Sequence, residues 1–276
     1  SLTLLVILPI TYGLKLFVKY RLILFNFSGL IIKQKPTPQL KVFNISWSFT
    51  SFFFNHLKKF ESLELLEKNL LSYTDSTDVL VFVEESFEPY KTKVKTNLEL
   101  LYQTIEFNLP EYPPEILENI PEFYPHPTHG NGPIEWGHPG FTMGYRHMCR
   151  MFSGEVYKFP IVQEYEYYLR LDTDSFIRTS LGYDIFKWAK ENECWYGYIA
   201  PAVQQDNEKV VEGLSEFVNS IYPNQIPDRW MYYTNWELGK VDWFLTSEYI
   251  TFYNMIDENG GIYTKRWGDA PIKFLG

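Results

Sequence analysis

A chain of 276 residues with 45% hydrophobic and 18% aromatic residues can bury a sizeable core, which excludes the intrinsically disordered class. The formal net charge of -9 argues against non-specific binding to nucleic acid, because such binding needs a basic surface that displaces counterions. The two cysteines, Cys149 and Cys194, are too few for a disulfide scaffold, and the sequence leaves their pairing open.

The first stretch, 1–32, is very apolar, but Lys15, Lys19 and Arg21 split it into pieces shorter than the roughly 20 residues that span a bilayer. It can be the remnant of a signal anchor, or a strand or helix that packs on the domain. Two prolines in the polar stretch 33–39 then indicate a linker. We therefore expect an apolar N-terminal segment with a linker over 1–39 and one folded domain over 40–276.

The domain opens with a β-α-β pattern. Residues 40–49 are β-branched and aromatic, 55–73 carry leucines at helical spacing, and 78–86 form a short apolar run typical of a buried strand. This pattern predicts a parallel sheet with helices on its outside. Ligands of such sheets bind beyond the carboxyl ends of the strands.

Further along, the sequence predicts a second helix over 91–105, a Pro-rich loop over 110–139 and a helix over 144–160. The strand that follows ends at Asp172-Thr173-Asp174. Two carboxylates this close repel each other unless a cation lies between them. At the end of a strand they can hold a divalent metal that carries a diphosphate, although the same pattern also occurs in surface turns.

Three segments carry a family resemblance: "YRHMCRMFSG", "YEYYLRLDTDSFI" and "TNWELGKVDWFLTSEYITFYNMIDENGGIYTKRWGDAP". Together, over about 145–271, they resemble the fungal-type α-1,2-mannosyltransferases of glycosyltransferase family 15. The resemblance implies an α/β GT-A fold with a central, mostly parallel sheet flanked by helices. It also implies GDP-mannose as donor, Mn2+ as cofactor, retention of anomeric configuration, and a type II Golgi membrane protein that extends mannose chains on glycoproteins.

Asp172 and Asp174 stand where this family usually carries Glu-Pro-Asp, so the charge is kept although the residues differ. The resemblance makes both of them candidate metal ligands, and Asp172 also a candidate contact to the nucleotide. The alternative is a solvated turn in which Asp174 caps a following helix.

Glu237, in "TNWELG", matches a family carboxylate proposed to face the anomeric carbon of the donor. Retention needs either a carboxylate nucleophile or a front-face route through an ion pair, and a carboxylate on that side stabilises the oxocarbenium character of both. Asp269, in "RWGDAP", matches a further family motif and is expected to bind the acceptor or take its proton. Capping or salt-bridging roles are the alternatives for both residues.

Tyr145, Arg146 and Arg150 are candidates to face the nucleotide, because a tyrosine can stack or hydrogen bond and the arginine fork suits phosphate. Structural salt bridges of the two arginines are the alternative. His147, in the same predicted helix, is expected to be packed rather than a ligand.

The family also carries a metal-binding histidine downstream of the "WGDAP" motif, and this chain reaches Gly276 without one. This departure suggests a fragment. A nucleotide-sugar donor and a mannosylated glycan or glycoprotein acceptor are the expected partners, with no nucleic acid and with membrane attachment through an N-terminal anchor. An inactive sugar- or nucleotide-binding relative and a GT-A enzyme with another donor are the alternative functions.

Overall fold

A computed structural model describes most of the chain from Gln39 onward, and residues 37–276 form one compact unit. The predicted segment 1–39 lies outside the described residues except for Gln39. The described residues are 39–44, 56–75, 77–94, 96–124, 141–172, 175–203, 213–223 and 230–276.

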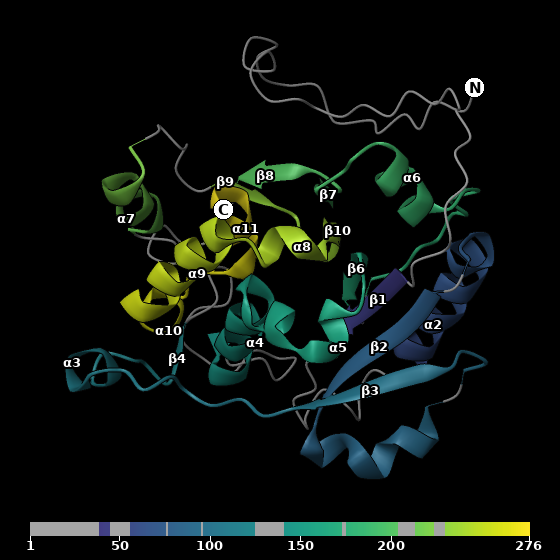
Figure 1. Cartoon of the computed structure of the whole chain (residues 1–276). Helices are drawn as coiled ribbons and strands as arrows, with labels where there is room; N and C mark the ends of the chain where they lie inside the picture. The colour runs from purple at the N-terminus through teal and green to yellow at the C-terminus, as the bar shows by residue number, and fades with distance from the viewer. Residues whose placement is uncertain are drawn as a thin grey trace. The chain divides into compact units, whose positions relative to one another are not determined.

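A six-stranded sheet with the order β3-β2-β1-β6-β10-β7 forms the centre of this unit (Figure 1). Its first four strands run parallel, whereas β10 and β7 run antiparallel to their neighbours. The prediction of a central, mostly parallel sheet is therefore confirmed. The strands are β1 (Gln39–Asn44), β2 (Thr77–Glu84), β3 (Leu100–Ile105), β6 (Tyr167–Asp172), β7 (Tyr196–Tyr198) and β10 (Trp236–Lys240).

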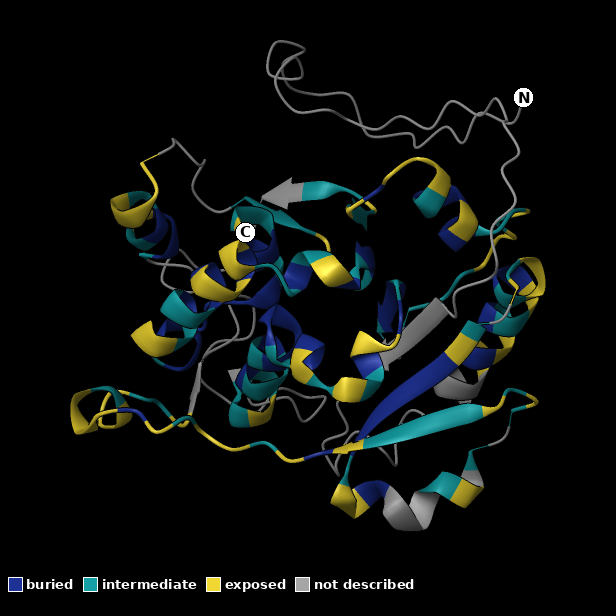
Figure 2. Cartoon of the chain, in the orientation of Figure 1, coloured by how far each residue is buried: buried dark blue, intermediate teal, exposed yellow. Residues whose placement is uncertain are grey.

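Two hydrophobic cores cover the two faces of the sheet, because alternate side chains of a strand point to opposite faces. On one face, leucines of α2 (His56–Asn69) and side chains of α6 (Ile185–Glu191) pack against Val81 and Leu169. On the other face, Phe82 and Tyr168 pack against the helices that follow β3 in the chain. Figure 2 shows the buried residues of β2 lying between these helical layers.

The helices of the second face come from the C-terminal half and from the segment before β6. They are α4 (Met143–Ser153), α5 (Pro160–Gln163), α8 (Val241–Phe244), α9 (Ser247–Asn259), α10 (Gly261–Thr264) and α11 (Asp269–Leu275), with the 3-10 turn η3 (Glu155–Lys158). Thr142 caps α4 through its side chain, which accepts from the backbone N–H of Tyr145. The predicted helix 144–160 is thus correct in position but broken after Ser153.

The predicted helix over 91–105 is wrong. Residues 85–93 form the 3-10 helix η2 (Glu85–Lys93), and residues 100–105 form β3, which pairs with β2 from Val79↔Leu100 onward. The leucines, the tyrosine and the β-branched residues of β3 suit a strand beside the apolar β2, and this tertiary pairing overrides the helical spacing.

Smaller elements complete the described part of the chain. They are η1 (Leu71–Tyr73), α3 (Pro114–Leu117), β4 (Phe123–Tyr124), β5 (Phe141–Thr142), β8 (Pro201–Val203), α7 (Leu214–Ile221) and β9 (Trp230–Tyr232). Cys149 and Cys194 are both buried and free, so they do not pair. Among the described helices, none has the length and apolar character needed to cross a membrane.

Candidate active site

Asp172 is the last residue of β6, beside the carboxyl end of β1, where Asn44 is its register partner. Its backbone N–H donates to the carbonyl of Asn235 at 3.0 Å, and its own carbonyl accepts from Ser175 at 2.9 Å. The side chain is 30% exposed. Asp172 therefore occupies the strand-end position expected of it, whereas Asp174 lies outside the described residues and its metal role stays a prediction.

Arg170, two residues earlier on β6, is a buried cation that joins two of the candidate carboxylates. Its Nε donates to Asp172 Oδ1 at 3.2 Å, and its Nη1 donates to Asp269 Oδ2 at 2.5 Å. The guanidinium also lies over the ring of Phe152, 4.1 Å from the centroid. Burial acts against the cation, but the nearby carboxylates together raise the pKa of Arg170.

Asp269 begins α11 and is buried. Besides the bond from Arg170, its Oδ2 accepts from the hydroxyl of Thr234 at 3.1 Å. Burial alone would favour the neutral acid, yet Arg170, Lys273 and Thr234 together keep the pKa of Asp269 below its ordinary value. The expectation that Asp269 binds the acceptor or takes its proton stays a prediction.

Glu237, on β10, is fully buried, with an exposed fraction of 0%. Its carboxylate accepts from the hydroxyls of Tyr168 at 3.0 Å and Tyr196 at 2.5 Å, and Lys273 Nζ lies 3.3 Å from its Oε1. Glu237 is thus enclosed by the protein, and its expected role beside the anomeric carbon stays a prediction. Two hydroxyls and an ammonium replace the water that a buried carboxylate loses.

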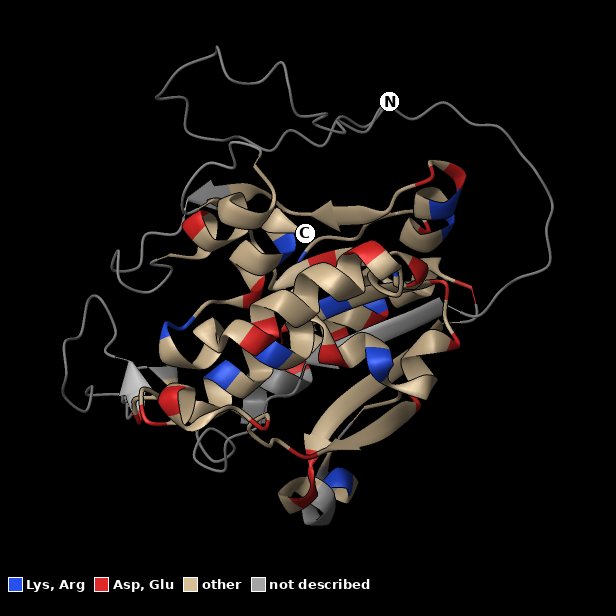
Figure 3. Ribbon diagram, turned by 60° about the vertical axis from the view of Figure 1, so that its left-hand side comes forward, with Lys and Arg blue, Asp and Glu red and all other residues tan. Residues whose placement is uncertain are grey.

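These charges form a four-residue cluster between the sheet and α11. Arg170 and Glu237 are register partners on adjacent strands, while Asp269 and Lys273 lie one turn apart on the helix. Each helix charge pairs with the opposite charge on the sheet. Three motifs distant in sequence thus meet, as expected from a shared site. Figure 3 shows acidic and basic segments interspersed where the sheet and these helices meet.

Arg170 and Lys273 were not among the site residues predicted from the sequence. A signal was present in both cases: Arg170 interrupts an apolar strand in "YYLRLD", and Lys273 interrupts the apolar helix "DAPIKFL". A charged residue at a position expected to be buried requires an oppositely charged partner. The sequence alone could not name that partner.

Arg146 and Arg150 fit the structural alternative rather than the nucleotide-facing role. Arg146 is buried and donates to the backbone carbonyls of Tyr263, Pro121 and Glu122 at 2.7 to 2.9 Å. Arg150 donates through Nε and Nη2 to both carboxylate oxygens of Asp257, each at 2.8 Å. Their donors are thus committed to the protein itself.

Tyr145 is half-buried and contacts Arg266. The guanidinium of Arg266 lies over the Tyr145 ring at 5.4 Å from the centroid, and its Nη2 lies 3.5 Å from the hydroxyl. Burial raises the pKa of this tyrosine, so the hydroxyl stays protonated. A contact of Tyr145 with the nucleotide stays a prediction.

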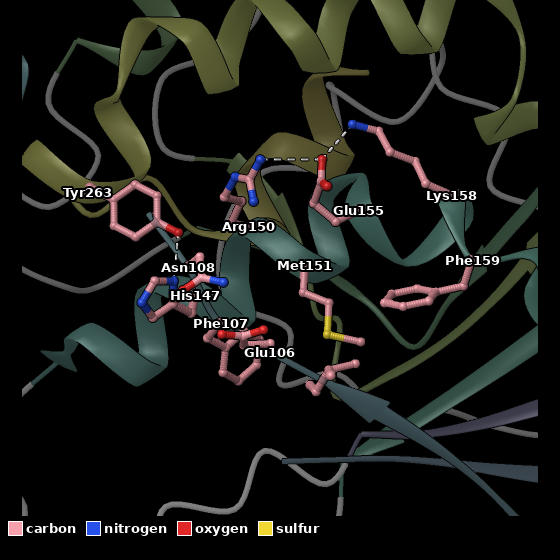
Figure 4. Close-up of a pocket in the computed structure, with 11 residues that line it drawn as sticks. Glu106, Phe107, Asn108, His147, Arg150, Met151, Glu155, Lys158, Phe159 and Tyr263 are labelled. Carbon is pink, nitrogen blue, oxygen red and sulfur yellow. Dashed lines mark hydrogen bonds and ion pairs between the residues drawn. The ribbon is translucent and has the colours of Figure 1, made fainter. Parts of the chain in front are cut away.

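A cavity of about 260 Å³ lies between the end of β3 and α4 (Figure 4), away from the charged cluster. His147 and Arg150 line it, and its polar groups bind one another: the Tyr263 hydroxyl lies 2.8 Å from His147 Nδ1, and Glu155 lies between Arg150 and Lys158. His147 also stacks on Phe107, as expected of a packed histidine.

The oxygen donors around Asp172 fit a metal that arrives with a nucleotide. Within the described ranges, no three His, Cys, Asp or Glu side chains are close enough together to hold an ion by themselves. Metals that travel with a diphosphate, however, need only one or two carboxylates besides the phosphates. Asp172 supplies one, and the buried amide oxygen of the adjacent Asn235 has no hydrogen-bond partner in this part of the chain.

The chain was compared with known protein families and relatives. Residues 80–276 match the family described as glycolipid 2-alpha-mannosyltransferase. The "Probable mannosyltransferase KTR3" of Saccharomyces cerevisiae is 32% identical over 150 residues, which cover 48% of this chain and 37% of the relative. The O-glycoside alpha-1,2-mannosyltransferase omh1 of Schizosaccharomyces pombe is 30% identical over 145 residues, which cover 46% of this chain and 37% of the relative. The chain therefore matches well under half the length of these relatives.

Solved structures with the same fold include Core-mannan synthase A of Aspergillus fumigatus in its Mn/GDP form, with a TM-score of 0.63 and 18% identity over 89% of this chain and 70% of that one. The mannosyltransferase Ktr4p of S. cerevisiae in complex with GDP has a TM-score of 0.62 and 19% sequence identity, and the match covers 87% of this chain and 66% of Ktr4p. The predicted GT-A type α/β fold is thereby confirmed.

Proposed function

This chain belongs to the glycolipid 2-alpha-mannosyltransferase family, and from that premise we propose that it is a retaining mannosyltransferase. It would move mannose from GDP-mannose to a mannose-containing glycan through an α-1,2 linkage. The observation that carries the proposal is the family match over 80–276, which includes all the candidate carboxylates. The convergence of Asp172 and Asp269 on Arg170 supports it, because nothing local requires these two residues to meet.

The donor would bind at the carboxyl ends of β1 and β6, with its diphosphate carried by Mn2+. Asp172 and Asp174 are the proposed metal ligands, and the amide oxygen of Asn235, whose backbone carbonyl accepts from Asp172, is a further oxygen donor. Hard oxygen ligands suit Mn2+. When bound, the ion neutralises charge that develops on the departing diphosphate. That solved relatives bind Mn and GDP at this fold supports the same choice here.

Glu237 is proposed to stabilise positive charge at the donor sugar without forming a covalent bond. A direct attack on the anomeric carbon would require the carboxylate to leave Tyr196 and Lys273, which hold it inside the protein. The front-face route needs only its negative charge nearby. Asp269 is proposed to position Arg170, which in turn orients Asp172.

The acceptor is proposed to be a mannosylated glycan or glycoprotein, and the site of action the Golgi, with attachment to its membrane through an N-terminal anchor. The family membership supports these assignments, since the named relatives act on glycolipids and O-glycosides.

A donor screen in the presence of Mn2+ tests the proposal. The full-length protein is incubated with a panel of nucleotide sugars and a mannose-terminated acceptor, and the products are analysed by mass and linkage. We expect transfer from GDP-mannose with an α-1,2 product. Transfer from another donor would select a different GT-A enzyme, and binding of GDP-mannose without turnover would select an inactive relative.

The variant Glu237→Gln tests the role of that carboxylate. It keeps the shape and the hydrogen bonds but removes the charge, so we expect GDP binding to survive and transfer to fall by about a thousandfold or more. Undiminished transfer would reassign Glu237 to structure alone.

A further inference from the structure

The ammonium of Lys273 is buried with Glu237 inside a cage of aromatic side chains. Its Nζ lies 3.3 Å from Glu237 Oε1, donates to the Tyr168 hydroxyl at 3.1 Å and contacts the Tyr157 hydroxyl. It also lies over the ring of Phe244, 4.2 Å from the centroid. Each of these contacts favours a cation, which interacts well with a carboxylate, hydroxyl oxygens and ring faces.

Lys273 is the cation that the described ion pairs assign to Glu237. Arg170, the nearest other cation, already donates to Asp172 and Asp269. Lys273 therefore holds the Glu237 carboxylate from the side of α11, while the hydroxyls of Tyr168 and Tyr196 hold it from the sheet.

We propose that Lys273 is a positioning residue of the transfer reaction, which holds the Glu237 carboxylate in one orientation on β10. The inference rests on the proposed function, in which the negative charge of Glu237 stabilises the donor sugar. Lys273 itself touches no reacting atom. Because Lys273 lies one turn after Asp269, α11 contacts both buried charges of the sheet: Asp269 pairs with Arg170, and Lys273 pairs with Glu237.

Other titratable groups around the pair do not replace Lys273. They are Tyr157 of η3, Tyr168 and Arg170 of β6, Tyr196 of β7, Tyr249 of α9 and Asp269 of α11. Burial together with the Glu237 charge raises the pKa of these tyrosines well above the ordinary value, so they remain neutral donors. Burial lowers the pKa of Lys273 itself to about 8, partly offset by Glu237.

The experiment compares wild type, Lys273→Met, and the double variant Glu237→Gln/Lys273→Met in the full-length protein. Thermal unfolding, GDP binding, kcat and KM are measured between pH 5.5 and 8, with Mn2+ present in the kinetic assays. The matched control is Lys190→Met on α6, which removes a partly exposed ion pair between Lys190 and Glu166. We expect that control to match wild type in all four measurements.

For Lys273→Met we expect a lower unfolding temperature, a fall of about tenfold or more in kcat per GDP-binding site, and an unchanged KM, because the donor still binds while Glu237 loses its fixed orientation. In the double variant the unfolding temperature returns toward wild type, because neither charge is left buried alone. Its transfer stays at least about a hundredfold low.

Two results would overturn the inference: a kcat of Lys273→Met equal to that of wild type, or a kcat lowered only as far as the fraction of folded, GDP-binding protein is lowered, as a purely structural pair would give. If Lys273→Met fails to fold, Lys273→Arg takes its place, because it keeps the charge but changes the position of the donors, and a kcat per GDP-binding site equal to wild type would then overturn the inference. If wild type itself transfers no mannose, the proposed function fails instead, and the unfolding temperatures of the variants then report on the pairing alone.

Discussion

The guanidinium of Arg170 lies 2.5 Å from the carboxylate of Asp269, a residue 99 positions further along the chain. Because Arg170 also donates to Asp172, it links the end of the central strand β6 to the start of α11. The family motif that contains Asp269 is thereby fixed to the candidate metal site.

The first prediction concerns Arg170→Met. The change leaves Asp269 buried without its cation, and breaking a buried pair in this way costs about 3–5 kcal/mol. We expect a loss of that order in the free energy of unfolding, measured with urea. Arg178→Met is the matched control, since Arg178 is 71% exposed and lies 3.9 Å from Glu61, so its loss should be within about 1 kcal/mol. Equal effects of the two variants would contradict a central role for Arg170.

The second concerns Asp172→Asn. The side chain is partly exposed, so the free energy of unfolding should change by about 1 kcal/mol or less. Loss of a metal-binding charge should weaken Mn2+-dependent GDP binding by about tenfold or more, measured by calorimetry. Asp242→Asn, on the exposed side of α8, should leave binding unchanged. Equal GDP affinity with and without Mn2+ in wild type would count against a metal at this site.

The third concerns acid stability. Burial, together with the nearby Arg150 and Arg146, lowers the pKa of His147 to about 4, whereas an unfolded histidine titrates near 6.5. Between these values the unfolded chain binds a proton that the folded chain does not. The contribution of His147 to the free energy of unfolding is therefore complete above about pH 6.5 and is lost as the pH falls toward 4. His147→Gln should reduce the fall in unfolding temperature between pH 7 and pH 5. An acid response identical to wild type would show that His147 does not contribute.

The fourth concerns Gly239 on β10. A Cβ placed there would come within 2.4 Å of the Tyr168 ring, whose hydroxyl binds Glu237. Gly239→Ala should therefore destabilise the protein by about 1–3 kcal/mol and lower transfer activity. Gly144→Ala is the comparison, because the nearest atom to a Cβ there is 3.8 Å away and alanine is the better helix former. A Gly239→Ala variant as stable as Gly144→Ala would refute the close packing at Tyr168.

The sequence by itself determined the parallel sheet, because a buried parallel strand requires an unbroken apolar run such as that of β2, and this pattern is local. It also determined that Asp172 ends a strand, and its motifs identified the family. It did not determine β3, whose leucines suit both helical and strand spacing until β2 pairs with them.

Only the tertiary structure decided which charges are buried and with what. Glu237 and Lys273 are 36 positions apart, and Arg170 and Asp269 are 99 apart, so no local pattern specifies these pairs. The environment of a carboxylate depends on the groups that replace its water, and folding alone brings those groups together. For that reason the sequence could name the carboxylates, whereas only the fold showed that Glu237 is enclosed, that Arg146 and Arg150 bind the protein itself, and that Lys273 stands beside Glu237.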